Sequence, residues 1–261
     1  MPNPVDHTGK VVIVTGGCRG VGRGIAERYL AYGADVVICC RHEPETLPTA
    51  DGREAAFVAA DIRDPDEVDK VVRFTVDRFG RLDVLVNNAG GSPPADSATA
   101  SPKFSTAIVN LNLMAPLVFA QRANAVMQEQ ETGGVIINIA SVSGIRPSPG
   151  TVAYGAAKAG LMSMTQTLAV DFAPKVRVVC VTAGLVRTEQ SHLYYGDEDG
   201  IAAVGNTIPL RRLADPEDIG DVCVFLSSPM ARYVDGASVI VDGGGERPAY
   251  LDASTAENSP R

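Results

Sequence analysis

The sequence has 261 residues, of which 45% are hydrophobic and 21% are charged, so it is long and apolar enough to bury a sizeable core. A formal net charge of -8 argues against general binding to nucleic acid or to an anionic membrane, because such proteins need a surplus of Lys and Arg. The apolar runs are far shorter than a membrane span, and the opening residues have no apolar signal core, so we expect a cytoplasmic protein.

Short runs rich in Val and Ile are predicted to be strands, and they lie at 10–14, 34–40, 55–61, 82–87, 134–140, 176–181 and 237–242. Each run is nearly continuous rather than alternating, which is typical of strands that are covered on both faces. Helical spacing predicts helices over 21–32, 65–79, 104–128, 152–172 and 216–226. Alternating strands and helices predict an α/β fold with a doubly wound parallel sheet.

Three segments are less regular than the rest. The segment 42–54 contains Pro44, Pro48 and Gly52, so a long helix is not expected there. The segment 189–210 has few periodic apolar positions, and we interpret it as a mobile flap over a pocket. The residues 246–261 are expected to form a flexible tail. Because no linker or internal repeat divides the chain, residues 1–261 are predicted to form a single domain.

The cysteines and histidines do not indicate a metal site. The chain has five cysteines without a C-x-x-C pair and three scattered histidines without an H-E-x-x-H motif. We therefore interpret Cys18, Cys39, Cys40, Cys180 and Cys223 as reduced thiols, and we predict neither a disulfide framework nor a metal.

A glycine cluster, TGGCRGVG at 15–22, follows the first predicted strand and precedes a helix. Glycines let the main chain approach a pyrophosphate closely, and a helix N-terminus offers free N–H groups and a partial positive charge. The spacing of Gly16, Gly20 and Gly22 differs from the usual G-x-G-x-x-G fingerprint. The cluster is either part of a dinucleotide site or only a tight strand-to-helix turn.

The residues after the second strand bear on the choice of dinucleotide. An acidic residue is usual at that place in NAD-binding proteins, whereas this chain has Cys40 followed by Arg41. Arg41, with Arg19 in the glycine turn, can pair with a 2′-phosphate, which favours NADP(H) over NAD(H). The alternative is that both arginines are solvated ends of their elements.

The stretch YGAAK places Tyr154 and Lys158 four residues apart, on one face of a helix. At about 5 Å and an effective dielectric near 20, the Lys158 charge would favour phenolate by roughly 3 kcal/mol, or about two pKa units. Tyr154 could then exchange a proton near neutral pH.

Four motifs, each at a predicted strand end or helix start, together resemble the short-chain dehydrogenase/reductase family in its shorter form: TGGCRGVG, NNAG at 87–90, Ser141 and YGAAK. The resemblance runs from about Gly9 to Gly245. It implies a Rossmann-type sheet of seven strands, a nicotinamide dinucleotide cofactor, and assembly as a homotetramer or a dimer.

The resemblance also assigns cofactor contacts to individual residues. They are Gly16, Arg19, Gly20, Val21, Gly22, Arg41, Asp61, Ile62, Asn88, Ala89, Gly90, Tyr154, Lys158, Val186 and Thr188. Asp61 would contact the adenine, although it could instead cap the helix that starts near Pro65. Val186 and Thr188 would contact the nicotinamide carboxamide, but Ala183 stands where the family usually has proline. Asn87 is interpreted as a structural residue that braces the central strands.

The implied catalytic residues are Asn112, Ser141, Tyr154 and Lys158. In that scheme Tyr154 exchanges the proton, Ser141 positions the substrate oxygen, Lys158 lowers the phenol pKa and Asn112 completes a proton relay. Asn110 is a rival to Asn112, and Ser143 is a rival to Ser141.

The predicted function is an NADP(H)-dependent oxidoreductase that acts on a carbonyl or secondary alcohol. The alternatives are an NAD(H)-dependent enzyme of the same family and a non-catalytic dinucleotide-binding or redox-sensing protein. A 3-oxoacyl thioester, a ketosteroid, a sugar and a xenobiotic ketone all remain open as the small-molecule substrate. No nucleic-acid or membrane partner is expected.

Overall fold

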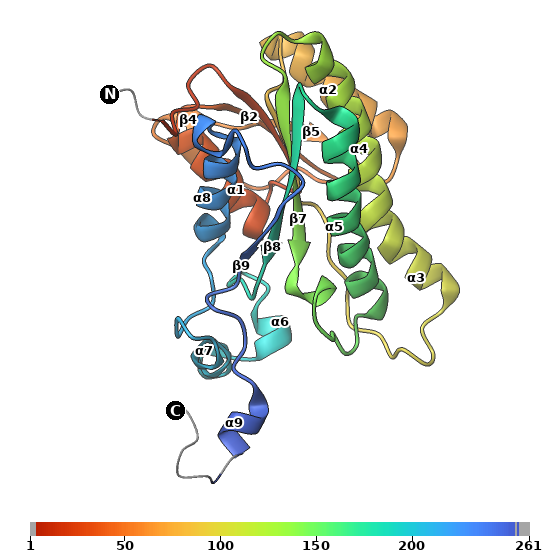
Figure 1. Ribbon diagram of the computed structural model, residues 1–261, viewed down its shortest axis with the longest axis vertical. Helices are drawn as coiled ribbons and strands as arrows, with labels where there is room; N and C mark the ends of the chain where they lie inside the picture. The colour runs from red at the N-terminus through yellow and green to blue at the C-terminus, as the bar shows by residue number, and fades with distance from the viewer. Residues whose placement is uncertain (1–3, 254, 256–261) are drawn as a thin grey trace.

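The computed structural model describes residues 4–253 and 255, and its central feature is a parallel sheet (Figure 1). Seven strands pair in the order β5-β2-β1-β6-β7-β8-β9. Their bounds are β1 Val11–Thr15, β2 Asp35–Cys40, β5 Ala56–Ala59, β6 Val84–Asn87, β7 Gly134–Ser141, β8 Val176–Ala183 and β9 Ser238–Val241. The strand order changes direction between β1 and β6, where a doubly wound sheet binds its ligands. The predicted fold class and the seven predicted strands are confirmed.

Helices cover both faces of this sheet (Figure 1). On one face lie α1 (Gly20–Ala31) and α8 (Pro216–Ser227), whose buried side chains, such as Ile25 and Val224, pack against the sheet. On the other face lie α2 (Pro65–Phe79), α4 (Ala115–Glu129) and α5 (Val152–Phe172). Phe119 and Met127 of α4 are completely buried in that second core. The five predicted helices are therefore present within about two residues of their expected ends.

The helix predicted over 104–128 is interrupted in its middle. It consists of α3 (Pro102–Val109), the π-helix η1 (Asn110–Met114) and α4. Among the described residues, Pro102–Glu129 is also the one helical stretch that is long and apolar enough to cross a membrane. Its inner side chains belong to the core on the sheet, so it is a core helix.

The segment expected to be an irregular flap contains regular structure instead. It holds α6 (His192–Tyr195) and α7 (Glu198–Thr207), which lie beyond the carboxyl ends of the strands (Figure 1). Ile201, Ile208 and Leu213 form a small apolar cluster there. Because these few apolar residues are widely spaced, periodicity alone did not reveal the helices.

The remaining irregular segments partly match the expectation. Residues 42–54 contain no helix but a short antiparallel pair, β3 (Thr49–Ala50) and β4 (Arg53–Glu54). Single turns of helix occur at η2 (Val142–Gly144) and η3 (Pro229–Ala231). The tail that was expected to be flexible contains α9 (Ala249–Ala253), and its residues 254 and 256–261 lie outside the described part.

The prediction that all cysteines are reduced is wrong for two of them. Cys18 and Cys40 form a disulfide, with their α-carbons 6.4 Å apart. The pair is separated by 22 residues, but β1 and β2 are parallel neighbours, so their carboxyl ends meet. Cys39, Cys180 and Cys223 are free and buried, as predicted.

Candidate active site and dinucleotide pocket

A cavity of about 710 Å³ opens at the carboxyl ends of the strands, where the strand order changes direction. This volume is within the range of small-molecule sites. Every residue that the sequence analysis placed in the site lines this cavity, except Asn112. The lining includes both the glycine turn and Tyr154.

The glycine turn has no room for side chains at two positions. Gly16 has a φ of 67°, in the left-handed region, and a Cβ there would lie 3.0 Å from the α-carbon of Ala89. A Cβ at Gly22 would overlap the carboxamide of Asn88 and the main-chain oxygen of Gly16. The turn is therefore a main-chain surface, which suits the close approach of a pyrophosphate.

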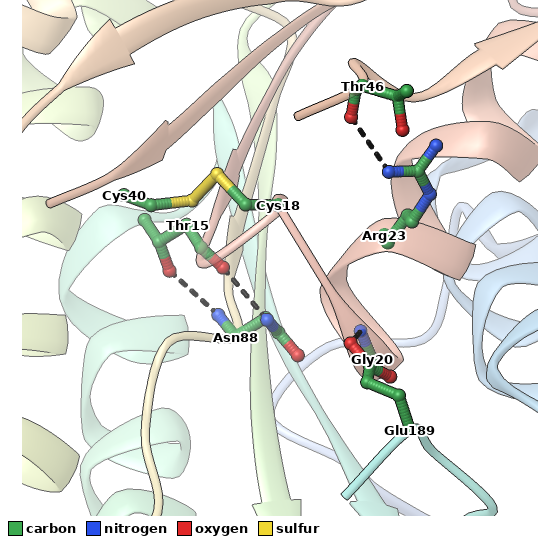
Figure 2. The surroundings of a disulfide bond; sticks show 8 residues. All are labelled: Thr15, Cys18, Gly20, Arg23, Cys40, Thr46, Asn88 and Glu189. Carbon is green, nitrogen blue, oxygen red and sulfur yellow. Dashed lines mark hydrogen bonds between the residues drawn. A yellow bond between two sulfur atoms is a disulfide. The ribbon is translucent and has the colours of Figure 1, made fainter. Parts of the chain in front are cut away.

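Thr15 joins this turn to the NNAG segment, a role that the sequence analysis missed. Its hydroxyl oxygen accepts hydrogen bonds from the main-chain N–H groups of Asn88 and Ala89, each at 2.9 Å. The Asn88 carboxamide in turn donates to the main-chain oxygen of Thr15 at 2.9 Å (Figure 2). A threonine at a strand end, directly before a glycine cluster, was the available signal.

Glu189, which contacts the N-terminus of α1, is a second residue that the sequence analysis missed. The N-cap residue Arg19 makes no side-chain cap, and the main-chain N–H of Gly20 donates to the Glu189 carboxylate at 3.0 Å (Figure 2). Glu189 comes from the segment after β8, which precedes α6. A carboxylate thus lies at the helix end where an anion is favoured.

Arg19 and Arg41 are both exposed at the cavity wall. Near them, Asp61 forms an ion pair with Arg63. Hydrogen bonding to Arg63 is the main cause that lowers the pKa of Asp61, and the charge of Arg41 adds to it. The alternative role for Asp61 as a helix cap falls to Asp64, whose side chain accepts from Asp66 N–H at the start of α2.

The segment after β8 lines the cavity although Ala183 stands where the family usually has proline. Ala183 pairs with Ser141 and Val241 as the last residue of β8. Val186 forms an isolated parallel bridge with Ala214, and Thr188 lies beside the glycine turn, 3.3 Å from a Cβ built at Gly20. Both Val186 and Thr188 line the cavity.

Ser141, Tyr154 and Lys158 meet in the cavity wall. Ser141 ends β7, while Tyr154 and Lys158 lie in the first turns of α5. The Lys158 ammonium is 5.6 Å from the centre of the Tyr154 ring and donates to the main-chain oxygen of Ile139 at 2.7 Å. The rival Ser143 accepts a hydrogen bond from Ser148 and does not line the cavity, whereas Ser141 does.

Burial is the main cause of the pKa shifts of Tyr154 and Lys158, and the shift of the Tyr154 phenol is opposite to the one expected. Burial raises the pKa of the Tyr154 phenol, although hydrogen bonding to Ser141 acts in the opposite direction. Burial also lowers the pKa of Lys158 to about 8. The expected lowering of the phenol pKa by Lys158 is not found, because removal from water disfavours the charged form of both groups.

Asn112 lies behind the cavity, in the π-helix η1, and is completely buried. Its carboxamide accepts from Gly91 N–H at 2.9 Å and donates to Gly91 O at 3.0 Å and to Ile108 O at 2.9 Å. A Cβ at Gly90 would lie 2.5 Å from the Asn112 oxygen and 3.4 Å from the Lys158 nitrogen. The rival Asn110 is exposed. The structure thus places Asn112, and not Asn110, beside the NNAG segment.

The chain is similar to known proteins over most of its length. A family model described as enoyl-(acyl carrier protein) reductase matches residues 16–246. The chain is 37% identical to L-rhamnose 1-dehydrogenase (NAD(P)(+)) of Azotobacter vinelandii, over 90% of this chain and 96% of that protein. It is 34% identical to 3-oxoacyl-[acyl-carrier-protein] reductase of Synechocystis sp., over 91% and 97% of the two chains.

A solved structure is similar over the same range. A putative short-chain alcohol dehydrogenase from Sinorhizobium meliloti superposes with a TM-score of 0.83 at 34% identity, covering 93% of this chain and 98% of that one. The chain therefore belongs to the short-chain dehydrogenase/reductase family. It is an oxidoreductase of the kind that acts on alcohol and carbonyl groups, and NAD(P) dependence is typical of this family.

Proposed function

We propose that the protein is an NADP(H)-dependent oxidoreductase that interconverts a carbonyl and a secondary alcohol, with Tyr154 as the acid/base. The observation that carries the proposal is the shared cavity, whose wall includes a main-chain glycine turn and two arginines as well as Ser141, Tyr154 and Lys158. The first group suits a phosphate-rich dinucleotide, and the second suits proton exchange at an oxygen.

The preference for NADP(H) rests on charge at the adenosine end. Arg41 directly follows β2, where a carboxylate would repel a 2′-phosphate, and Arg19 supplies a second cation. The nearby Asp61 carboxylate is already paired with Arg63, so it leaves Arg41 available to an anionic ligand. Gly16, Gly20, Val21 and Gly22 would hold the pyrophosphate, and Asn88, Ala89, Gly90 and Ile62 would line the adenosine.

Each candidate catalytic side chain has a distinct task in this mechanism. When bound, the nicotinamide supplies or accepts the hydride. Ser141 donates a hydrogen bond to the reacting oxygen, and Tyr154 gives it a proton during reduction or takes one during oxidation. Lys158, beside the Tyr154 ring, would hold the nicotinamide ribose, and Asn112 holds the Gly91 segment in place.

The first test compares two dinucleotides. The purified protein is titrated with NADPH and with NADH while the nicotinamide fluorescence is followed. We expect NADPH to bind more tightly, and we expect Arg41→Ala to weaken NADPH far more than NADH. Equal losses for both dinucleotides would contradict a contact between Arg41 and the 2′-phosphate, and tighter binding of NADH would favour the NAD(H)-dependent alternative.

The second test addresses catalysis. Ketones, aldoses and 3-oxoacyl thioesters are screened by NADPH oxidation, since relatives carry names of sugar and 3-oxoacyl enzymes. Tyr154→Phe should leave NADPH binding almost intact and lose nearly all turnover, because it removes the phenol hydroxyl that exchanges the proton. Full turnover in this variant would contradict the proposed role, and NADPH binding without turnover of any substrate would favour the non-catalytic alternative.

Assembly and location complete the proposal. We expect a homotetramer or dimer in the cytoplasm. Large apolar side chains are exposed on the surface, including Tyr233, Val170 and Ile240, which are 100%, 77% and 53% exposed. Light scattering of the purified protein would measure the assembly, and a monomeric mass would contradict it.

A further inference from the structure

The Cys18–Cys40 disulfide lies in the wall of the candidate dinucleotide cavity. Cys18 belongs to the glycine turn after β1, and Cys40 is the last residue of β2 (Figure 2). Both residues are partly exposed and both line the cavity. Their α-carbon separation of 6.4 Å is within the range that a disulfide spans without backbone movement. The bond therefore ties the glycine turn to the neighbouring strand end.

The bond fixes the positions from which two cations extend. Arg19 directly follows Cys18, and Arg41 directly follows Cys40. The turn itself is rich in glycine, which gives it unusual conformational freedom when it is not tethered. On its other side the turn is held by Thr15 and Asn88. Towards β2 it is held at its start by the hydrogen bond from Gly16 N–H to Cys39 O at 2.8 Å and, at Cys18, by the disulfide.

Cys18 and Cys40 are also the partly exposed cysteines of the chain. The remaining cysteines, all within the described part of the chain, are buried. Burial raises the pKa of Cys39 to about 12 and also raises the pKa of Cys180 and Cys223. Thiol exchange requires access and thiolate character, so a small thiol or disulfide that enters the cavity would react at Cys18 and Cys40.

We propose that Cys18 and Cys40 form a reversible thiol–disulfide pair, and that the disulfide form binds a 2′-phosphorylated dinucleotide more tightly than the dithiol form. The inference rests on the proposed function, because it assigns Arg19 and Arg41 to the 2′-phosphate. The cavity described above, with both arginines in its wall, is formed with the disulfide closed. Reduction removes the tether at Cys18, directly before Arg19, so the distance between the two cations is less fixed.

The exchange balances with a low-molecular-weight disulfide such as oxidised glutathione. The thiolate of one protein cysteine attacks that disulfide, forms a mixed disulfide and releases one small thiol. The second protein cysteine then attacks the mixed disulfide, closes the Cys18–Cys40 bond and releases the second small thiol. The protein pair loses two electrons, the small disulfide gains them, and the two thiol protons leave with the released thiols.

Cofactor binding and the redox state are then linked in both directions. If the disulfide form binds NADPH more tightly by some factor, NADPH must shift the thiol–disulfide equilibrium towards the disulfide by the same factor. A dinucleotide in the cavity also covers the sulfur atoms and slows their reaction. Bound NADPH therefore protects the disulfide from reduction.

The experiment uses the full chain equilibrated in glutathione buffers of graded redox ratio. Alkylation and mass spectrometry measure the fraction of the Cys18–Cys40 disulfide, with and without NADPH. Fluorescence titration then measures the dissociation constants for NADPH and NADH in the oxidised and reduced states. We expect reduction to weaken NADPH binding by about fivefold or more and NADH binding by less, and NADPH to raise the disulfide fraction.

Variants separate this pair from the other thiols. Cys18→Ser and Cys40→Ser should bind NADPH as the reduced protein does, in any buffer, whereas Cys223→Ala should respond to oxidation like the wild type. A pair that stays reduced in oxidised glutathione would overturn the inference. So would equal NADPH affinity in both redox states, and that result would leave the proposed function intact. Failure of both dinucleotides to bind in either state would instead overturn the proposed function together with the inference.

Discussion

Among single residues, Glu189 has the most direct electrostatic consequence. Its carboxylate accepts a hydrogen bond from Gly20 N–H, at the positive end of α1, where the dinucleotide phosphates are proposed to bind. An incoming pyrophosphate must compete with this carboxylate for the same main-chain donors. The Glu189 side chain therefore has to leave the Gly20 N–H before the phosphates reach the helix end.

We predict that Glu189→Gln strengthens NADPH binding by about two- to fivefold, as expected for removing one charge near a helix end. Fluorescence titration would measure the change. Glu131→Gln is the matched control, because Glu131 is exposed in the loop before β7, at the other end of the strands, and its loss should leave affinity unchanged. Weaker binding in Glu189→Gln would mean that this carboxylate supports the site.

At the scale of elements, Asp83 joins β1 to the start of β6. Its nearly buried carboxylate accepts from Val11 N–H at 3.0 Å, from Lys10 at 3.0 Å and from Arg81 at 2.6 Å. Burial alone would raise the pKa of Asp83, but the hydrogen bonds from Arg81, Val11 and Lys10 lower it overall. The carboxylate is thus more stable as an ion in the folded protein than in water.

We predict that Asp83→Asn lowers the free energy of unfolding by about 2–4 kcal/mol. The neutral carboxamide cannot balance the charges of Lys10 and Arg81, which donate to the buried carboxylate in the wild type. The pKa of Asp83 is lowered on folding, so its stabilising contribution is present above its unfolded pKa near 3.8 and is lost as the pH falls through its folded value. Urea unfolding at pH 7 and near pH 3 should therefore show a smaller difference between variant and wild type in acid. A constant difference would contradict this linkage.

At the scale of the whole molecule, the burial of Lys158 affects stability in alkaline solution. Its pKa falls from an ordinary 10.5 to about 8 on folding, so the unfolded chain binds more protons between these values. The contribution of Lys158 to the free energy of unfolding therefore rises as the pH increases from about 8 to 10.5, by at most ~3 kcal/mol.

Other groups titrate in the same pH range, so the prediction concerns the difference in unfolding free energy between the wild type and a variant without Lys158. The buried Cys39 and Tyr29 have raised pKa values and oppose the trend of Lys158. We expect the unfolding free energy of the wild type, relative to Lys158→Met, to increase between pH 7.5 and pH 10 in urea titrations. A relative decrease over that range would contradict burial of the ammonium.

The sheet was predictable because its strands, such as Val135 to Ala140, are apolar on both faces and this pattern has one structural solution. The cavity lining was predictable where a polar or charged residue stands at a strand end, as Ser141 does, or directly after one, as Arg41 does. The disulfide, the Thr15 contacts and the Glu189 contact were not, because each depends on which strand ends become neighbours. The two helices within 189–210 were missed because they bury few residues, so their apolar pattern is weak.

In the π-helix η1, finally, the number of residues determines which side chains face the site and which face the core. A π turn is equivalent to one residue inserted into an α-helix, so it rotates everything that follows by about 100°. Asn112, inside the π-helix, faces Gly91, and Phe119, after it, faces the sheet core. Deleting one residue from Asn110–Met114 would put these two faces out of phase, so that the chain could keep the carboxamide or the core contact, but not both. Single-residue gaps in this segment should therefore be rarer than substitutions among functional members of the family.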